Sequence, residues 1–403
     1  MRARAAEAPV PERAEGWRTS PSTRMVANDS MTAAPSASFL AIASTFAAYA
    51  VAGLVASPAP ARLAPAAPAP GFSVERVTDR VYALVRTDPP GLMFEANAAF
   101  VVGDSGVLVV DGGSNPASAR QVLAELRRVT RRPVRWVVNT HWHDDHVLGN
   151  QLWRDSFPGV EIVAHARTRE GMLGDGAANR PRFAEAAPRA AAGLRERVRK
   201  GESLAGGPMG DEERASHESS VALAEHWVAE YAGVRPVAPT RVFDDTLSIA
   251  LGGGVARLHW LGNAHTRGDI VVELPRERVL IVGDLVSWPV PLVGSTSFPL
   301  EFGPTLDRVL ALPHVSLVPG HGPVLATDEY PRLVARLLAS MARQTRAAVA
   351  RGETLDQARA SVDLSEFRRL IAGDSRVRDI LFTQYVAGPG VARAYEAAKG
   401  EPK

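Results

Sequence analysis

Apolar runs bounded by glycine, proline and polar residues recur through the middle of the chain and predict a series of short strands. Strands are expected over residues 74–85, 98–102, 107–110, 134–139, 161–164, 241–249, 255–260, 270–274, 279–282 and 316–318. A helix is expected over residues 116–129, because Val122, Leu123, Leu126 and Val129 share one face. This number of strands fits two sheets packed together with helices outside, which is an α/β architecture.

Two long segments do not follow the strand pattern and predict helices. Residues 167–237 are rich in alanine, arginine and glutamate, and the glycines at 201, 206, 207 and 210 predict a loop that interrupts the helices. Residues 327–398 predict several helices with breaks at Gly352 and Gly373. The first segment is an insertion that could cover a substrate cleft, pair with another subunit or pack on the surface.

The N-terminal region has a different composition. Residues 39–55 are apolar and small, and residues 57–70 form an alanine and proline tract, which together are typical of a secretion signal and spacer. We therefore predict export to the periplasm, with an uncleaved N-terminal membrane anchor as the alternative. The expected organisation is a signal or anchor with linker over residues 1–71, a main domain over 72–326 and a helical extension over 327–403.

Composition narrows the classes of partner. Hydrophobic residues are 46% of the 403 residues, enough for a sizeable core, and the formal net charge is only +2. The sequence has no basic patch interleaved with aromatic residues, which argues against nucleic-acid binding and favours a small-molecule substrate. The absence of cysteine excludes disulfides and thiolate ligands. Composition leaves the oligomeric state open.

Four potential metal ligands lie within six positions directly after the strand expected at 134–139. They are His141, His143, Asp145 and His146. Imidazole nitrogens and carboxylates are donors that zinc takes in hydrolytic enzymes. If the chain stays extended, His141 and His143 point to one side by the two-residue period, and the adjacent Asp145 and His146 diverge. One pair for each metal is the natural outcome, which predicts a two-metal site.

Three further ligands are expected where later strands end. His265 follows the strand at 255–260, Asp284 closes the apolar run at 279–282, and His321 closes the run at 316–318. Loops at strand ends are where a rigid sheet usually positions such groups. An aspartate such as Asp284, after an apolar strand, is also a common turn or cap residue. Asp111, after the strand at 107–110, could equally support a turn, or it could orient a ligand histidine without binding the metal itself.

These motifs resemble those of the metallo-beta-lactamase superfamily. The HxHxDH signature is matched by His141, His143, Asp145 and His146, and the later motifs follow in the family's order over roughly residues 72–324. The resemblance implies a four-layer αββα sandwich, with the helical insertion and helical C-terminal extension added. It also implies that His141, His143 and His265 bind a first metal, that Asp145, His146 and His321 bind a second, and that Asp284 bridges both. Some beta-lactamases carry a cysteine near that last position, and this chain has none.

The implied cofactor is a pair of zinc ions, with iron or manganese as the alternative metals. Two cations about 3.5 to 4 Å apart can share a water and lower its pKa to about 7, which supplies a bridging hydroxide at neutral pH. Asp145 is the expected catalytic residue, because it would orient this hydroxide and pass its proton to the leaving group. The other histidines, at 165, 217, 226, 259 and 314, are interpreted as ordinary core or surface residues, and Asp144 as a residue behind the ligands or facing solvent.

The sequence therefore predicts a zinc-dependent hydrolase that cleaves an amide, lactone, thioester or ester bond. A single-iron enzyme similar to persulfide dioxygenases is one alternative, and a metal-stabilised binding protein is another. Phosphodiesterase activity also stays open, because two-metal sites serve phosphoryl chemistry. Residues 91–97, the insertion and residues 287–299 are expected to shape the pocket, but they carry no signature of a substrate.

Overall fold

The computed structural model describes residues 71–400. The signal segment and the alanine and proline tract expected before residue 71 lie outside the described residues. Among the residues described, no helix is both long enough and apolar enough to cross a membrane.

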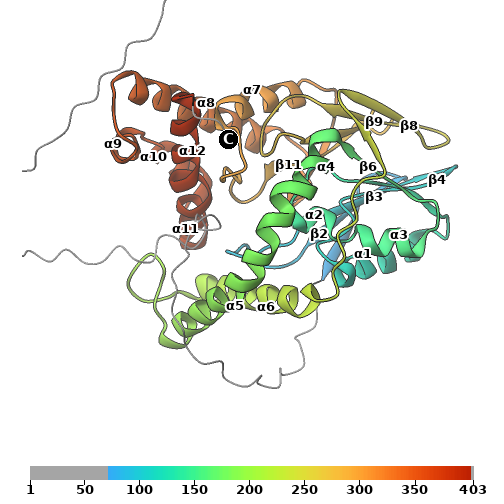
Figure 1. The fold of residues 1–403 in the computed structure, drawn as a ribbon, viewed down its shortest axis with the longest axis horizontal. Helices are drawn as coiled ribbons and strands as arrows, with labels where there is room; N and C mark the ends of the chain where they lie inside the picture. Colours follow the sequence, from blue (N-terminus) through green and yellow to red (C-terminus); the bar gives the residue numbers. More distant parts are fainter. Residues whose placement is uncertain (1–70, 401–403) are drawn as a thin grey trace, which may run out of the picture. The chain divides into compact units, whose positions relative to one another are not determined.

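Strands of the described chain form two sheets (Figure 1). The first sheet has seven strands in sequence order, antiparallel from β1 to β4 and parallel from β4 to β7. Its strands are β1 (Phe72–Arg76), β2 (Val81–Arg86), β3 (Ala98–Gly103), β4 (Gly106–Val110), β5 (Val134–Val138), β6 (Glu161–His165) and β7 (Arg241–Phe243). The second sheet has the order β12-β11-β10-β9-β8, with only β11 and β12 parallel. Its strands are β8 (Thr246–Ala250), β9 (Val255–Trp260), β10 (Ile270–Leu274), β11 (Val279–Ser287) and β12 (Ser316–His321).

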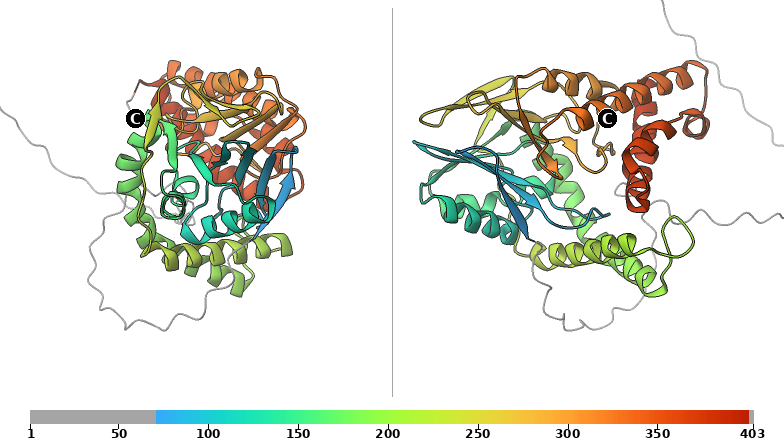
Figure 2. Two further views of the ribbon diagram at one scale, coloured as in Figure 1. Left: turned by 90° about the vertical axis from the view of Figure 1, so that its right-hand side faces the viewer. Right: turned by 180° about the vertical axis from the view of Figure 1, so that it is seen from behind.

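Three apolar clusters hold four layers together. Leu108 and Leu258 belong to a cluster between the two sheets. The outer face of the first sheet packs on α1 (Pro116–Val129) and α3 (Asn150–Ser156), and that of the second packs on α7 (Pro299–Leu310) and α8 (Glu329–Ala350). Figure 2 shows the two sheets face to face, with helices on both outer sides. The expected αββα sandwich is confirmed, and the helix at Pro116–Val129 has the predicted bounds.

Four of the expected strands differ from the observed strands by more than one residue at an end. Residues 74–85 form parts of two strands, because the Thr78 hydroxyl accepts from the main chain of Arg80 and Val81 and turns the chain there. Residues 241–249 are also divided, since the chain leaves the first sheet after Phe243 and enters the second at Thr246. The strands expected to end at 282 and 318 continue to 287 and 321. Asp284 and His321 therefore lie inside strands and not after them.

The insertion and the C-terminal extension are helical, as predicted. The insertion comprises α4 (Ala166–Gly171), the π-helical turn η1 (Met172–Gly176), α5 (Ala177–Lys200) and α6 (Asp211–Tyr231), with the glycine-rich loop between the last two. The extension continues from α8 through α9 (Leu355–Ser361), α10 (Ser365–Ala372), α11 (Arg376–Phe382), the π-helical turn η2 (Thr383–Ala387) and α12 (Gly388–Ala398). The two regions touch: Ser375 donates to Glu212 at 2.6 Å, and Arg376 donates to the main-chain oxygens of Gly206 and Pro208.

Candidate metal centre

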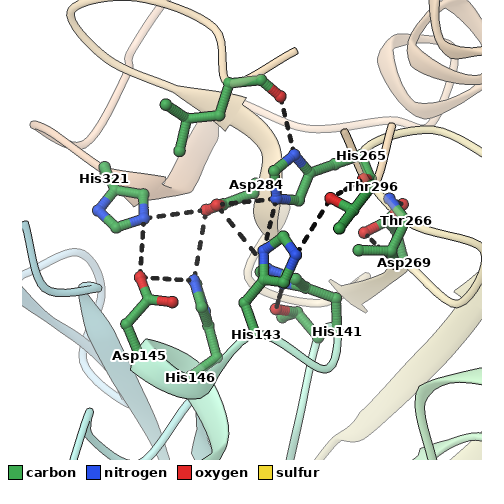
Figure 3. Close-up of polar contacts among 12 residues, drawn as sticks. His141, His143, Asp145, His146, His265, Thr266, Asp269, Asp284, Thr296 and His321 are labelled. Carbon is green, nitrogen blue, oxygen red and sulfur yellow. Dashed lines mark hydrogen bonds and ion pairs between the residues drawn. The ribbon is translucent and has the colours of Figure 1, made fainter. Parts of the chain in front are cut away.

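All seven residues predicted as ligands converge at one end of the two sheets (Figure 3). They form two groups, within each of which the ligand atoms lie within 4.8 Å of one another. The first group is His141, His143, His265 and Asp284, and the second group is Asp145, His146 and His321. We keep these two names below.

Local structure explains the grouping, although not by the strand period that the sequence suggested. Strand β5 ends at Val138, and Asp145 and His146 lie in the short helix α2 (Asp144–Val147). Both of these side chains belong to the second group, whereas His141 and His143 belong to the first. The change from extended chain to helix after His143 therefore separates the two pairs.

The Asp284 carboxylate lies between the groups, with one oxygen toward each. Its Oδ2 is 3.8 Å from His141 Nε2 and 3.4 Å from His265 Nε2. Its Oδ1 is 3.5 Å from His146 Nε2 and 3.3 Å from His321 Nε2. Strand β11 is irregular here, since its pairing with β12 shifts register on both sides of Gly283, where φ is 52°. The bulged strand directs a buried carboxylate between the two groups.

Asp111 fixes the orientation of one histidine in each group. His146 Nδ1 donates a hydrogen bond to Asp111 Oδ2 at 2.9 Å. The Thr140 hydroxyl donates to the same oxygen at 2.6 Å, and therefore accepts from His141 Nδ1, 3.1 Å away. When neutral, both histidines keep an Nε2 lone pair that points into the site. Asp111 has φ of 52°, a left-handed conformation that aspartate tolerates at a functional position.

The other three histidines are also held by their outer nitrogens. His265 Nδ1 donates to the main-chain oxygen of Leu292 at 2.8 Å, and His321 Nδ1 donates to that of Glu95 at 3.1 Å. His143 uses the opposite nitrogen, because its Nε2 lies 3.1 Å from Thr296 Oγ1 and its Nδ1 faces the first group. Outer partners of this kind orient the histidines of metal sites.

In the first group, burial keeps His141 and His143 uncharged. His143 Nδ1 is 3.1 Å from His141 Nε2 and 2.9 Å from His265 Nε2. Burial lowers the pKa of His141 well below its ordinary value, and it lowers the pKa of His143 to about 3. Three imidazole nitrogens that face one another suit a cation.

In the second group the histidines attract protons. Burial opposes a charge on His146 and on His321, but the nearby carboxylates outweigh it, so the pKa of His146 is raised well above its ordinary value and that of His321 to about 9. Burial likewise works to raise the pKa of Asp145, but the charge of His146 lowers it well below its ordinary value. Asp145 Oδ2 lies 3.4 Å from His146 Nε2 and 3.3 Å from His321 Nε2.

Buried atoms of the second group, and the Asp284 oxygen that faces it, form no hydrogen bond, although the nitrogens lie 3.3 to 3.5 Å from the oxygens. They are Asp145 Oδ2, His146 Nε2, Asp284 Oδ1 and His321 Nε2. Buried polar atoms normally form hydrogen bonds, so four such atoms that converge on one point without one are arranged to hold a cation. Two imidazoles and two carboxylates are a donor set that fits zinc. The residues present therefore fit a metal in each group, consistent with a binuclear centre.

Neighbouring residues enclose the site. The indole of Trp142 packs edge-on against His143, with ring centroids 4.5 Å apart, and the insertion covers it, because an added Cβ at Gly171 would lie 2.5 Å from that indole. Asp144 turns away from the ligands and accepts from Arg180 of α5 at 2.8 Å. On the other side, the Phe94 ring lies 4.8 Å from His321.

Sequence reasoning missed most of the outer partners. Thr140 and Thr296 lie in no recognisable motif, and the carbonyls of Leu292 and Glu95 belong to the main chain, which every residue has. Only Asp111 was identified, because it follows an apolar strand. The remaining histidines lie outside both groups; for example, His165 bonds the main-chain oxygen of Asp244, and His314 pairs with Asp328 at 2.9 Å.

Comparison with known proteins identifies a matching family and several similar proteins. Residues 93–321 match the Metallo-beta-lactamase superfamily. A linear primary-alkylsulfatase from Pseudomonas sp. is 27% identical over 243 residues, 58% of this chain and 42% of that protein. A hydroxyacylglutathione hydrolase from Gloeobacter violaceus is 38% identical over 81 residues, 19% of this chain and 30% of that protein. The chain thus spans less than half the length of these relatives. Among solved structures, a metallo-beta-lactamase from Pontibacter korlensis is 18% identical with a TM-score of 0.44, covering 66% of this chain and 99% of that one.

Proposed function

Because the chain belongs to the metallo-beta-lactamase superfamily of metal-dependent hydrolases, we propose that it is a two-zinc enzyme that hydrolyses sulfate esters of primary alcohols. The position of Asp284 carries the two-metal part of this proposal. Each of its oxygens lies within 3.8 Å of two histidine nitrogens, on opposite sides. A carboxylate in this position can bridge two cations. A single iron bound by the first group would leave the ligands of the second group without a metal.

When bound, two metals would lower the pKa of a shared water toward neutrality and polarise the bond to be cleaved. The protein's own part is to hold that water and to move its proton. Asp145 is the residue for this step, because its side chain is 20% exposed whereas that of Asp284 is 2% exposed. Its carboxylate can reach a substrate, orient the attacking water and pass the proton to the leaving alcohol.

The sulfate ester is supported by the similarity to the alkylsulfatase, which extends over 58% of the chain. The surroundings of the second group are compatible with the apolar part of such a substrate. Leu92, Met93 and Phe94 are partly exposed, and the Phe94 ring lies beside His321. An alkyl group packed there would leave the sulfate facing the metals. Hydrolysis by water would then yield the free alcohol and inorganic sulfate.

An acyl thioester is the second candidate. It is favoured by the similarity to a hydroxyacylglutathione hydrolase, although that similarity covers only 81 residues. The same metals and the same Asp145 would serve a carbonyl as well as a sulfuryl centre. The two candidates differ in which group the metals must polarise and in which atom leaves.

The test is hydrolysis by the zinc-loaded full chain of three probes under the same conditions: dodecyl sulfate, a hydroxyacyl glutathione thioester and a chromogenic cephalosporin. We expect inorganic sulfate release to be the fastest reaction and to be abolished by Asp145→Asn. Faster thioester cleavage would replace the sulfate ester with the second candidate. Turnover of none of the three by a protein that holds two zinc ions would overturn both substrate assignments.

A further inference from the structure

A single tyrosine of the C-terminal extension contacts both loops that supply main-chain partners to the ligand histidines. Tyr385 lies in the π-helical turn η2, between α11 and α12. Turns of this type are rare and occur frequently at functional sites. Its side chain and its main chain bond to different loops.

The first contact is with the loop between β2 and β3. The Tyr385 hydroxyl donates to the main-chain oxygen of Leu92 at 2.9 Å. Three residues later, the main-chain oxygen of Glu95 accepts from His321 Nδ1. Between them, the Phe94 ring packs edge-on against both Tyr385 and His321, with ring centroids 5.6 and 4.8 Å apart. The hydroxyl therefore holds the segment that orients a histidine of the second group.

The second contact is with the loop between β11 and α7. The main-chain N–H of Val293 donates to the oxygen of Tyr385 at 3.1 Å. The adjacent Leu292 carbonyl accepts from His265, and Thr296 contacts His143, so this loop orients two histidines of the first group. The extension contacts the same loop again through Arg393, which donates to the Ser297 oxygen at 3.3 Å.

We propose that Tyr385 is a positioning residue through which the C-terminal extension sets the geometry of the metal centre, with its hydroxyl acting on the second group. This inference rests on the two-metal centre proposed above. The physical reason is that the Nε2 lone pair of His321 points correctly only while the Glu95 carbonyl stays in place, and the hydroxyl of Tyr385 restrains that loop from the extension side. Partners beyond the ligands commonly change metal affinity about 10- to 100-fold.

The chain offers a matched control in Tyr395 of α12. Its hydroxyl also donates to a main-chain oxygen, that of Glu353, at 2.7 Å. Tyr395 packs with Ala348 and Ala358 in an apolar cluster that contains no residue of either loop described above. Tyr385→Phe and Tyr395→Phe therefore remove the same atom and the same kind of hydrogen bond from the same extension.

The experiment compares both variants with the wild-type full chain after removal of metal. Cobalt is titrated in and followed by its visible absorption, and zinc affinity is measured by competition with a chelator. For Tyr385→Phe we expect the second ion to bind about tenfold more weakly, with a changed cobalt spectrum, while the first ion is unaffected. For Tyr395→Phe we expect the metal affinities and the cobalt spectrum of the wild type. This should hold even if Tyr395→Phe loses as much thermal stability as Tyr385→Phe.

Two results would overturn the inference. One is a wild-type spectrum and wild-type affinities for Tyr385→Phe, and the other is an equal loss of affinity in Tyr395→Phe. Failure of the two-metal proposal is distinguishable from either, because the wild-type chain would then bind fewer than two cobalt ions before any variant is compared.

Discussion

The first and second groups are built from similar ligands but differ in charge. The first group holds three histidines whose nitrogens lie 2.9 and 3.1 Å apart, and burial keeps at least His141 and His143 neutral. In the second group, carboxylates raise the pKa of His146 and His321, and four buried atoms have no hydrogen-bond partner. The first group can therefore bind a cation without releasing protons from His141 or His143. In the second group, His146 and His321 must lose protons when a cation binds.

The difference shows that two sites built from the same types of ligand can differ in the protonation of their histidines. The number of carboxylates decides the result, since the histidines of the second group face both Asp145 and Asp284, and Asp111 bonds His146 directly. We therefore expect the metal affinity of the first group to depend less on pH than that of the second group. We also expect Asp145, in the second group, to perform the proton transfer of the reaction. The following changes test this division.

Asp145→Asn is expected to have the largest effect on activity. It removes the exposed carboxylate of the second group, so turnover should fall by about 10²- to 10⁴-fold, while thermal stability changes little. Steady-state kinetics and thermal unfolding measure the two quantities. Asp144→Asn is the matched control, because its carboxylate binds Arg180 and not the ligands, so it should lower stability more than turnover. Unchanged turnover in Asp145→Asn would remove that residue from the mechanism.

Asp284→Ala is expected to reduce the metal content from two ions toward one. The first group keeps three imidazoles that already face one another, but the second loses the oxygen 3.3 Å from His321 and 3.5 Å from His146. Elemental analysis after dialysis measures the loss. Retention of both ions would show that Asp284 is not an essential bridge.

Asp111→Asn tests whether one residue serves both groups. Asparagine tolerates the positive φ at this position, so the backbone should be preserved. Asp111 accepts with both oxygens, Oδ1 from the Thr140 N–H and Oδ2 from the Thr140 hydroxyl and His146. The NH2 group of asparagine would face a donor at one of these two places, so we expect metal affinity to fall about 10- to 100-fold in both groups. Chelator competition gives the two affinities. A loss confined to the second group would leave His141 independent of Asp111.

In the metal-free protein, the two groups should affect stability at opposite ends of the pH range. The pKa of His321, raised to about 9, gives a stabilising contribution that is complete below the unfolded value of about 6.5 and is lost as the pH rises through about 9. The pKa of His143, lowered to about 3, acts at the other end, since stability is lost as the pH falls below about 6.5. Denaturant unfolding in the presence of a chelator should show both declines. Zinc binding should abolish the decline at alkaline pH. If the free energy of unfolding of the metal-free protein did not fall at alkaline pH, the charge assigned to the second group would be wrong.

Much of the fold and the ligand set could be predicted from the sequence, because both depend on local patterns. Apolar patterns predicted β9 and β10 with their observed bounds, and the crowding of His141 to His146 indicated metal chemistry. The turn at Thr78 and the exit from the first sheet after Phe243 were missed, because side-chain capping and sheet assignment are not visible in hydrophobic periodicity. Tyr385 could not have been found, since its importance comes from two loops about 90 and 290 residues away in the chain.

The most direct test of the two-metal account is the metal content of the purified full chain, followed during stepwise removal with a chelator. The account predicts two zinc ions per chain, lost in two separate steps, with hydrolytic activity lost in the step that removes the more weakly held ion. One ion per chain, or a single iron, would contradict the central claim that Asp284 bridges two unequal metal sites.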